Sequence, residues 1–306
     1  MLSHLGLAWR EGGAPRVRVR DGAGWQEWTV PSSCTGGRDD GDRWAGAATL
    51  VTPEVTGYEI RGVGETLVQE IDATGGPLRP RDPRERHSDT MLGYRLRHGY
   101  RNRASWGADE SLRFAADGTN RCPDAYYPVQ ALTVHHSVTR TKDPDPAATV
   151  RSIYFDQTIT RNFGDLGYHL LIDGAGTVYE GRSSGSDGEP VFGGTALAQM
   201  NNAAHVAGYN AGNVGVALLG DFTDVAPGRA AVNSLIKVLA ILSAVCNLDP
   251  TGRTAYVNPI SGAARNVRTI SGHRDWAATE CPGDLLYPLL PNIRRQVARR
   301  RSSIKV

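Results

Sequence analysis

Short stretches of alternating apolar and polar residues occupy the first part of the chain, and clusters of Gly, Pro and Asp separate them. A strand with one buried face shows this period of two. The pattern predicts strands at residues 4–10, 16–21, 25–30, 47–52, 57–63 and 66–73. Residues 1–83 are therefore expected to form a small all-β domain.

The pattern changes after Arg103, where β-branched and aliphatic runs alternate with stretches of helical period. The runs predict strands at residues 131–137, 168–173, 177–181, 213–220 and 267–271. Helices are expected at residues 147–160, at 229–246 and from Gly283 onward, where apolar residues recur at Leu285, Leu286, Leu289 and Ile293. Such alternation is typical of an α/β fold with a mixed central β-sheet flanked by helices. This domain is expected to span residues 103–298, with a basic tail at 299–306.

Residues 84–102 are basic and polar, and they lack the periodicity that would bury one face of a helix or strand. We interpret them as a basic linker. Arg and Tyr alternate in this region, as they do in some nucleic-acid contacts, but no binding fold surrounds it and the chain carries a net charge of only +2. A nucleic-acid partner is therefore not expected.

Composition indicates an ordinary folded protein, since 40% of the residues are hydrophobic and 22% are charged. The most apolar segment, residues 232–248, is interrupted by Asn233, Lys237 and Asn247, so no membrane span is predicted.

The first ten residues lack the organisation of a secretory signal. Four cysteines are too few for a disulfide-built scaffold: Cys34, Cys122, Cys246 and Cys281.

Two segments contain candidate metal ligands. The first, LTVHHSV, places His135 and His136 on a predicted strand, where they point to opposite faces, so that only one can face a given cleft. The second, ISGHRDWAATECPGD, places His273 just after a strand and Cys281 before a Pro-Gly turn. Imidazole nitrogen and thiolate sulfur both bind zinc, and three such ligands leave the fourth tetrahedral position open, as in catalytic zinc sites.

The residues alone leave other interpretations open. A histidine on a strand is more often a core or surface residue than a ligand, and a lone cysteine is usually buried or bridged. His273-Arg274-Asp275 also has the form of a kinase catalytic-loop tripeptide, but the glycine-rich loop and DFG element of kinases do not occur in place in this chain.

An ordered series of motifs over residues 103–290 resembles the family of N-acetylmuramoyl-L-alanine amidases and peptidoglycan recognition proteins. The motifs are RASWGA at 103–108, VHHS at 134–137, DLGYHLLI at 165–172, GTVYEGR at 176–182, HVAGYN at 205–210, VGVALLGD at 214–221, GHRD at 272–275 and TECPG at 279–283. In that family the first histidine of the strand motif, the histidine of the GHR motif and the cysteine before Pro-Gly bind zinc. The resemblance thus implies that His135, His273 and Cys281 hold one Zn²⁺, with His136 facing away.

The same resemblance implies roles for further residues. Tyr168 would donate a hydrogen bond to the oxyanion that forms when the carbonyl is attacked. Thr279 occupies a position where the family has Lys or Thr, close to the metal-bound water, and its hydroxyl would have a catalytic role in orienting that water or the oxyanion. His205, Tyr209 and Asn210 match a loop that lines the substrate groove, and they are expected to bind substrate.

The implied reaction is zinc-dependent hydrolysis of the amide between N-acetylmuramic acid and L-alanine, with the glycan strand and stem peptide of peptidoglycan as partner. Family members that only recognise peptidoglycan typically lack the cysteine, which this chain retains. Two alternatives remain: a non-catalytic peptidoglycan receptor, and a cell-wall hydrolase in which Cys281 is the nucleophile and His273 or His135 its base. The substrate implies an extracellular or wall-associated protein, either a secreted bacterial enzyme or a phage lysin.

Overall fold

The computed structural model describes residues 2–33, 36–39, 44–52, 54–62, 64–74, 99–185, 189–193 and 198–304. Most of the predicted basic linker, residues 84–98, lies outside the described residues, and so does Cys34. Cys122 and Cys246 take part in no disulfide within the described part of the chain.

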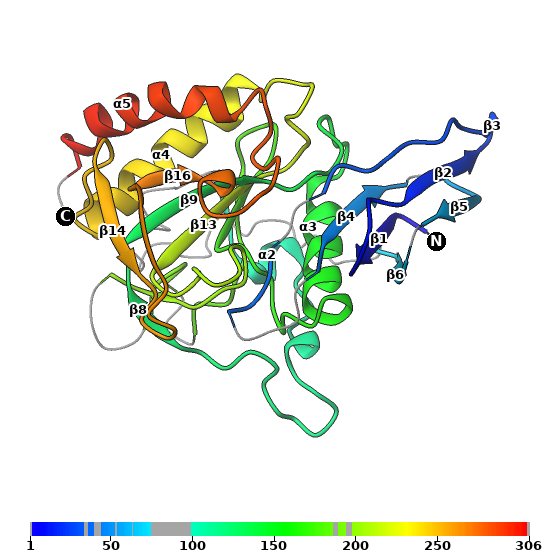
Figure 1. Ribbon diagram of the computed structural model, residues 1–306, viewed down its shortest axis with the longest axis horizontal. Helices are drawn as coiled ribbons and strands as arrows, with labels where there is room; N and C mark the ends of the chain where they lie inside the picture. Colours follow the sequence, from blue (N-terminus) through cyan, green and yellow to red (C-terminus); the bar gives the residue numbers. More distant parts are fainter. Residues whose placement is uncertain are drawn as a thin grey trace.

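A six-stranded sheet with the order β16-β9-β13-β10-β11-β7 forms the centre of the molecule (Figure 1). Neighbours among β16, β9, β13 and β10 pair in parallel, β11 pairs antiparallel with β10, and β7 pairs parallel with β11. The sheet is therefore mixed, as the sequence predicts. The bounds of its strands are β7 (Tyr100–Arg101), β9 (Ala131–His136), β10 (Leu170–Ile172), β11 (Val178–Glu180), β13 (Asn213–Leu218) and β16 (Ile270–Gly272).

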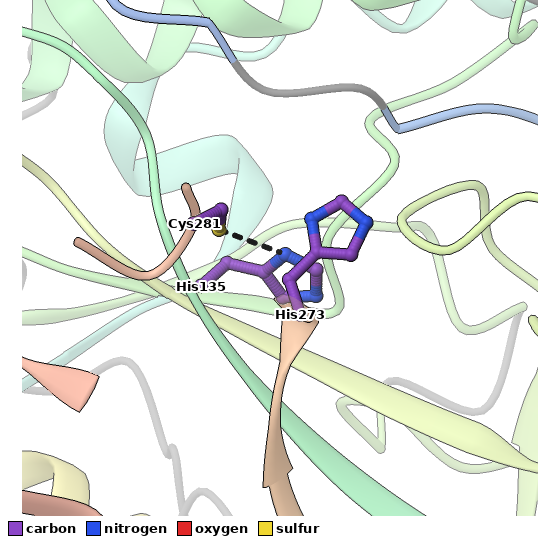
Figure 2. Close-up of side chains that lie close together, drawn as sticks. All are labelled: His135, His273 and Cys281. Carbon is purple, nitrogen blue, oxygen red and sulfur yellow. Dashed lines mark hydrogen bonds between the residues drawn. The ribbon is translucent and has the colours of Figure 1, made fainter. Parts of the chain in front are cut away.

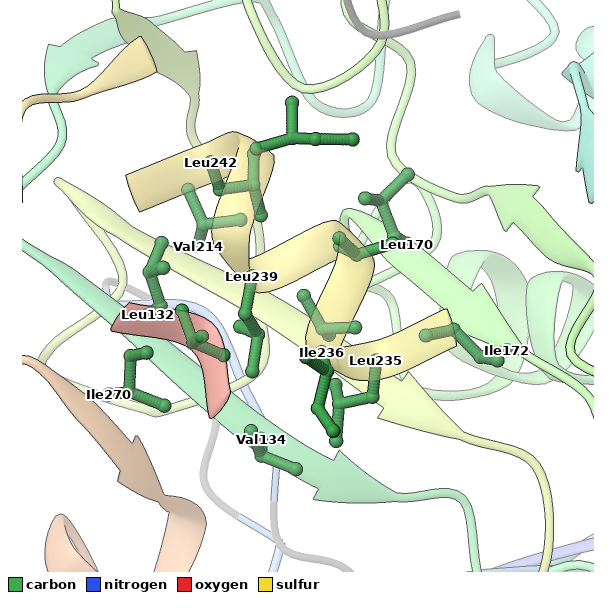
Figure 3. Packing of buried hydrophobic residues seen from close by; sticks show 14 of the residues in the cluster. Leu132, Val134, Leu170, Ile172, Val214, Leu235, Ile236, Leu239, Leu242 and Ile270 are labelled. Carbon is green, nitrogen blue, oxygen red and sulfur yellow. The ribbon is translucent and has the colours of Figure 1, made fainter. Parts of the chain in front are cut away.

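Two helices, α4 (Arg229–Val245) and α5 (Leu290–Arg301), cover one face of this sheet (Figure 1). The helical period of α4 turns one apolar stripe toward the strands, and alternate residues of β9 and β13 meet it (Figure 3). The buried residues of this cluster include Leu132, Val134, Val214, Leu235, Ile236, Leu239 and Leu242. Since each such side chain stabilises the fold by about 1.5–3 kcal/mol when buried, this layer is the principal core.

The opposite face of the sheet packs against α2 (Arg103–Trp106) and α3 (Pro146–Phe155), and α3 continues into one π-helical turn, η3 (Asp156–Thr160). Trp106 and Tyr154 pack edge to face in this second core. β13 presents Asn213, Gly215 and Ala217 toward this side, and the two residues nearest His135, Gly215 and Ala217, are small. The sheet therefore leaves space on this face beside β9, and the candidate site occupies that space.

Two three-stranded antiparallel sheets form the N-terminal part, which is all-β as predicted. Leu5, Leu7 and Trp9 of β1 contribute most of the small core beneath them. The first sheet has the order β4 (Gly46–Val51), β1 (His4–Trp9), β6 (Thr66–Ile71), and the second has the order β3 (Gly24–Trp25), β2 (Arg16–Asp21), β5 (Gly57–Arg61).

The first of these sheets is docked on α3. His4 Nε2 lies 3.0 Å from Thr149 Oγ1, and the guanidinium of Arg151 donates two hydrogen bonds, of 3.0 and 2.8 Å, to the carbonyl of Ala73. Ile71 packs with Ala73 and α3 in a shared apolar cluster. The N-terminal strands and the α/β part thus bury common surface.

A two-stranded sheet, a hairpin and three 3-10 turns complete the described chain. β8 (Tyr126–Pro128) pairs with β12 (Gln199–Asn201), and β14 (Arg253–Val257) pairs with β15 (Ala264–Arg268). The turns are η2 (Glu110–Arg113), η4 (His273–Asp275) and η5 (Tyr287–Leu289). Among the described helices, none combines the length and apolar character that crossing a membrane requires.

The prediction of a helix from Gly283 is wrong in its starting point, because α5 begins only at Leu290. Pro288 explains the difference, since proline lacks the N–H that a helix interior needs and clashes with the preceding turn. Pro291, by contrast, sits in the first turn of α5, where no N–H is required. Leu285 consequently stays exposed.

The far end of α5 extends beyond the predicted domain limit, to Arg301. Ile293 and Val297 lie one turn apart and are both buried against the main core, so they hold the basic segment in helical form. The residues predicted as a basic tail therefore begin inside a helix.

His4 yields a prediction about stability and pH. Burial, opposed by Asp145 and reinforced by Arg151, lowers the pKa of His4 to about 4, so the folded state keeps this imidazole neutral while the unfolded state protonates it near pH 6.5. This histidine should therefore cost stability as pH falls from about 6.5 to about 4, by up to about 3 kcal/mol. In urea unfolding measured across that range, His4→Gln should flatten the pH dependence. An unchanged slope in the variant would show that His4 is not held neutral at this interface.

Candidate metal centre

His135 and His273 meet at the carboxyl edge of the parallel strands β9 and β16. The register pairs Gly272, the last residue of β16, with Val134 of β9. His273, the next residue after Gly272, therefore comes level with His135. The imidazole centroids of His135 and His273 lie 4.6 Å apart, and both side chains are fully buried. Parallel pairing thus brings together two histidines that are far apart in the sequence.

Cys281 reaches the same point from the loop that follows η4. The N–H of Arg274 donates to the carbonyl of Cys281 at 3.0 Å, which closes this loop back onto η4. Cys281 Sγ lies 3.6 Å from His135 Nδ1 and accepts a hydrogen bond of 3.4 Å from the N–H of His136. Figure 2 shows the thiol facing the imidazole of His135, with the ring of His273 beside it. The candidate donor atoms of His135, His273 and Cys281 all lie within 4.8 Å of one another.

The neighbouring His136 points to the other face of the sheet. Its Nδ1 accepts from the N–H of Phe222 at 3.2 Å and lies 3.6 Å from Asp221 Oδ1, and its ring packs near that of Phe222. The structure thus places His135, and not His136, with the other two candidate ligands, which agrees with the alternation of side chains along a strand.

The three donors suit a zinc ion. Zn–N bonds of about 2.0–2.1 Å and a Zn–S bond of about 2.3 Å separate tetrahedral ligands by roughly 3.3–3.6 Å. The distance of 3.6 Å between Cys281 Sγ and His135 Nδ1 already matches this separation. All three candidate donor atoms lie within 4.8 Å of one another, so they would need to move only slightly closer together to bind one ion. Two imidazoles and one thiolate are also a donor set that zinc prefers.

Tyr168 and Thr279 each lie next to one of the candidate ligands. The ring of Tyr168 is buried and its centroid lies 5.2 Å from that of His135. Thr279 is half-buried, and its Oγ1 accepts a hydrogen bond of 3.3 Å from the N–H of Cys281. Both residues are therefore close to the candidate ligands, while their catalytic roles remain predictions.

The three residues predicted to bind substrate have different surroundings. His205 is buried, with Nδ1 3.0 Å from His135 Nε2. Asn210 is also buried, and its Oδ1 accepts from the N–H groups of His205 and Val206 at 2.8 and 2.7 Å. Tyr209 is half-buried against the rings of Tyr256 and Trp276. Substrate binding by these residues stays a prediction, and the contacts of His205 and Asn210 are with the protein interior.

A buried charge cluster that the sequence analysis missed holds the backbone before Tyr168. Asp165 forms ion pairs with Arg103 (3.0 Å), Arg182 (2.8 Å) and Arg113 (3.3 Å). Burial by itself would raise the pKa of Asp165, but the three guanidinium groups outweigh it and lower that pKa below its ordinary value. The sequence contained one indication of this cluster, since Arg103, Asp165 and Arg182 each belong to one of the family motifs.

This cluster predicts a large effect of Asp165→Asn. The change leaves buried guanidinium groups without their carboxylate, and it should lower the free energy of unfolding at pH 7 by about 3–5 kcal/mol. Because the pKa of Asp165 is lower in the folded than in the unfolded state, this stabilisation should be complete above about pH 4 and vanish as pH falls through the folded pKa. Urea unfolding at pH 7 and in acid measures both effects, with the exposed Asp117→Asn as control. A loss at pH 7 as small as that of the control would contradict this role.

Comparisons with known proteins agree with the motifs. The sequence profile of N-acetylmuramoyl-L-alanine amidases matches residues 125–284, just over half of the chain. A human N-acetylmuramoyl-L-alanine amidase is 30% identical over 171 residues, covering 53% of this chain and 24% of that protein. A peptidoglycan recognition protein of Trichoplusia ni is 27% identical over 162 residues, covering 52% of this chain and 72% of that protein. The matched region thus spans about a quarter of the human relative's length.

Among solved structures, Drosophila peptidoglycan recognition protein SD is similar with a TM-score of 0.46 and 25% identity, covering 62% of this chain and 92% of that one. The profile match and the named relatives confirm the resemblance predicted from the motifs. The chain belongs to the N-acetylmuramoyl-L-alanine amidase family.

Proposed function

We propose that this protein is a zinc-dependent amidase that hydrolyses the bond between N-acetylmuramic acid and L-alanine in peptidoglycan. Membership in the amidase family supports a peptidoglycan-related amidase or binding function. The observation that carries the catalytic proposal is the convergence of His135, His273 and Cys281, whose candidate donor atoms lie within 4.8 Å. A receptor has no need of three such donors in one place.

In this proposal each residue has a definite task. His135, His273 and Cys281 hold the ion and leave one tetrahedral position unfilled by protein. When bound there, zinc would activate a water molecule near neutral pH and polarise the scissile carbonyl. Tyr168, next to His135, would donate its phenolic proton in a hydrogen bond to the carbonyl oxygen as negative charge develops on that atom. Thr279 would fix the Cys281 loop through its bond to the Cys281 N–H.

The proposed substrate gives the expected location and partner. Peptidoglycan lies outside the cytoplasmic membrane, so we expect the protein to act extracellularly or in the wall, as a secreted bacterial enzyme or a phage lysin. The glycan strand and the stem peptide are the groups that it would contact.

Cysteine chemistry is the second candidate, and one distance favours it. The 3.6 Å between Cys281 Sγ and His135 Nδ1 also suits a thiolate activated by an imidazole base. Complete burial of the thiol argues against this candidate, because a nucleophile must reach the substrate carbonyl. Dependence on metal separates the two mechanisms.

Digestion of purified peptidoglycan with and without a zinc chelator tests the proposal. We expect the wild type to release new L-alanine amino termini, detected by mass spectrometry, and to lose this activity on chelation and recover it when zinc is restored. Cys281→Ser should lose at least about 100-fold in activity, because hydroxyl is a far poorer zinc ligand than thiolate. Cys246→Ser, at the far end of α4, is the matched control and should remain active.

Other results have clear meanings. Full activity after complete removal of zinc would replace the zinc proposal with cysteine chemistry. Binding to peptidoglycan without any release of amino termini would identify a receptor.

A further inference from the structure

His205 lies directly behind His135 in the interior. Its Nδ1 is 3.0 Å from His135 Nε2, and its Nε2 is 2.8 Å from the carbonyl oxygen of Asn213. The two imidazole rings meet edge to face, with centroids 5.0 Å apart. His205 is only 1% exposed, which leaves its ring little surface with which to bind a polysaccharide.

The carbonyl of Asn213 determines where the protons lie along this chain. A carbonyl oxygen only accepts, so the Nε2 of His205 carries a hydrogen and donates it. Two nitrogens 3.0 Å apart need one donor and one acceptor, and a neutral imidazole with its hydrogen on Nε2 offers Nδ1 as the acceptor. His135 must then donate from Nε2 to His205 Nδ1.

This tautomer leaves the lone pair of His135 on Nδ1. Nδ1 is the atom that faces Cys281 Sγ at 3.6 Å. The two nitrogens of His135 therefore have separate tasks: Nε2 is engaged by His205, and Nδ1 is presented toward the candidate metal position. A metal-binding histidine commonly has such an acceptor for its second nitrogen, which fixes both its tautomer and the orientation of its ring.

The surroundings hold His205 in this place. Gly215 on β13 provides the space, because a Cβ there would lie 2.6 Å from His205 Cγ. Asn210 binds the backbone N–H of His205 at 2.8 Å, and its own Nδ2 donates to Asp39 Oδ1 at 2.7 Å. The position of the ring is thus determined by a strand, a loop and a residue of the N-terminal part.

We propose that His205 is a positioning residue for zinc, which fixes the ring and tautomer of His135 so that Nδ1 binds the ion. This inference rests on the proposed zinc site and goes beyond it, since it gives His205 a role in metal affinity in place of the predicted role in substrate binding.

The test measures the zinc dissociation constant of the full-length protein by competition with a chromophoric chelator. His205→Leu removes both ring bonds and should weaken zinc binding by about 10–100-fold. His205→Asn places an amide oxygen near the former Nδ1, where it can accept from His135, and should recover much of the affinity. His205→Gln places its amide near the former Nε2, where it can reach Asn213 but not His135, and should bind zinc as weakly as His205→Leu.

His169→Gln is the matched control. His169 is equally buried, but among the described residues its ring bonds only to backbone groups, accepting from the N–H of Gly215 and donating to the carbonyl of Asn201, both at 2.9 Å. This variant should lose stability and keep an affinity for zinc close to that of the wild type.

The order of affinities decides the proposal. Tight zinc binding by the wild type and His205→Asn, with weak zinc binding by His205→Gln, supports the proposal. The comparison of the Asn and Gln variants remains valid even if His205→Leu does not fold. Equal affinities for the Asn and Gln variants would overturn it while leaving the zinc site intact. A wild type that binds no zinc would instead overturn the proposed function, and this inference with it.

Discussion

Parallel pairing of β9 with β16 and β13 is the interaction on which the candidate site depends. The pairing with β16 brings His273 level with His135, and the pairing with β13 places Ala217 opposite His135 and Gly215 two residues before it. Because side chains alternate along a strand, a register shift of one residue in β9 would turn His135 into the α4 and α5 core and bring His136 to the site. Leu132 and Val134 oppose that shift, since they would lose their burial against α4. The main core thus determines which histidine faces the metal position.

The N-terminal part is joined to this arrangement at two places. Its first sheet packs on α3, and Asp39 accepts hydrogen bonds from the loop of residues 208–210 and from Asn258. Asn210 connects that carboxylate to the backbone of His205. These contacts give the N-terminal residues a structural connection to the candidate ligands, in addition to any role that they have in binding the wall. The predicted division at residues 83 and 103 remains a prediction about domains.

Sequence periodicity predicted the elements that bury an apolar stripe. The strands β1, β4, β9 and β13 and the helix α4 all lie where alternation or helical spacing indicates. β7, β8 and β12 are only two or three residues long, too short for any period to be detected. The predicted strand at 267–271 spans the end of β15 and the start of β16, because Thr269 lies between two strands in different sheets. The local sequence pattern does not show that the chain leaves its pairing with β14 and begins to pair with β9 at this point.

The candidate site was predictable where motifs specify chemistry, and less so where it depends on tertiary contacts. His135, His273 and Cys281 come together as the motifs imply. The direction of the His205 ring depends on the space at Gly215 and on Asn210, and the meeting of Asp165 with three arginines depends on α2, η2 and the segment after β11, which are separate in the sequence. Neither arrangement follows from spacing along the chain.

Zinc K-edge X-ray absorption on the purified protein tests the central claim most directly. The account predicts one zinc ion with two nitrogen ligands at about 2.0–2.1 Å, one sulfur ligand at about 2.3 Å and one further light atom, with the sulfur contribution lost in Cys281→Ser. A zinc ion with no sulfur ligand in the wild type, or no retained zinc, would contradict it.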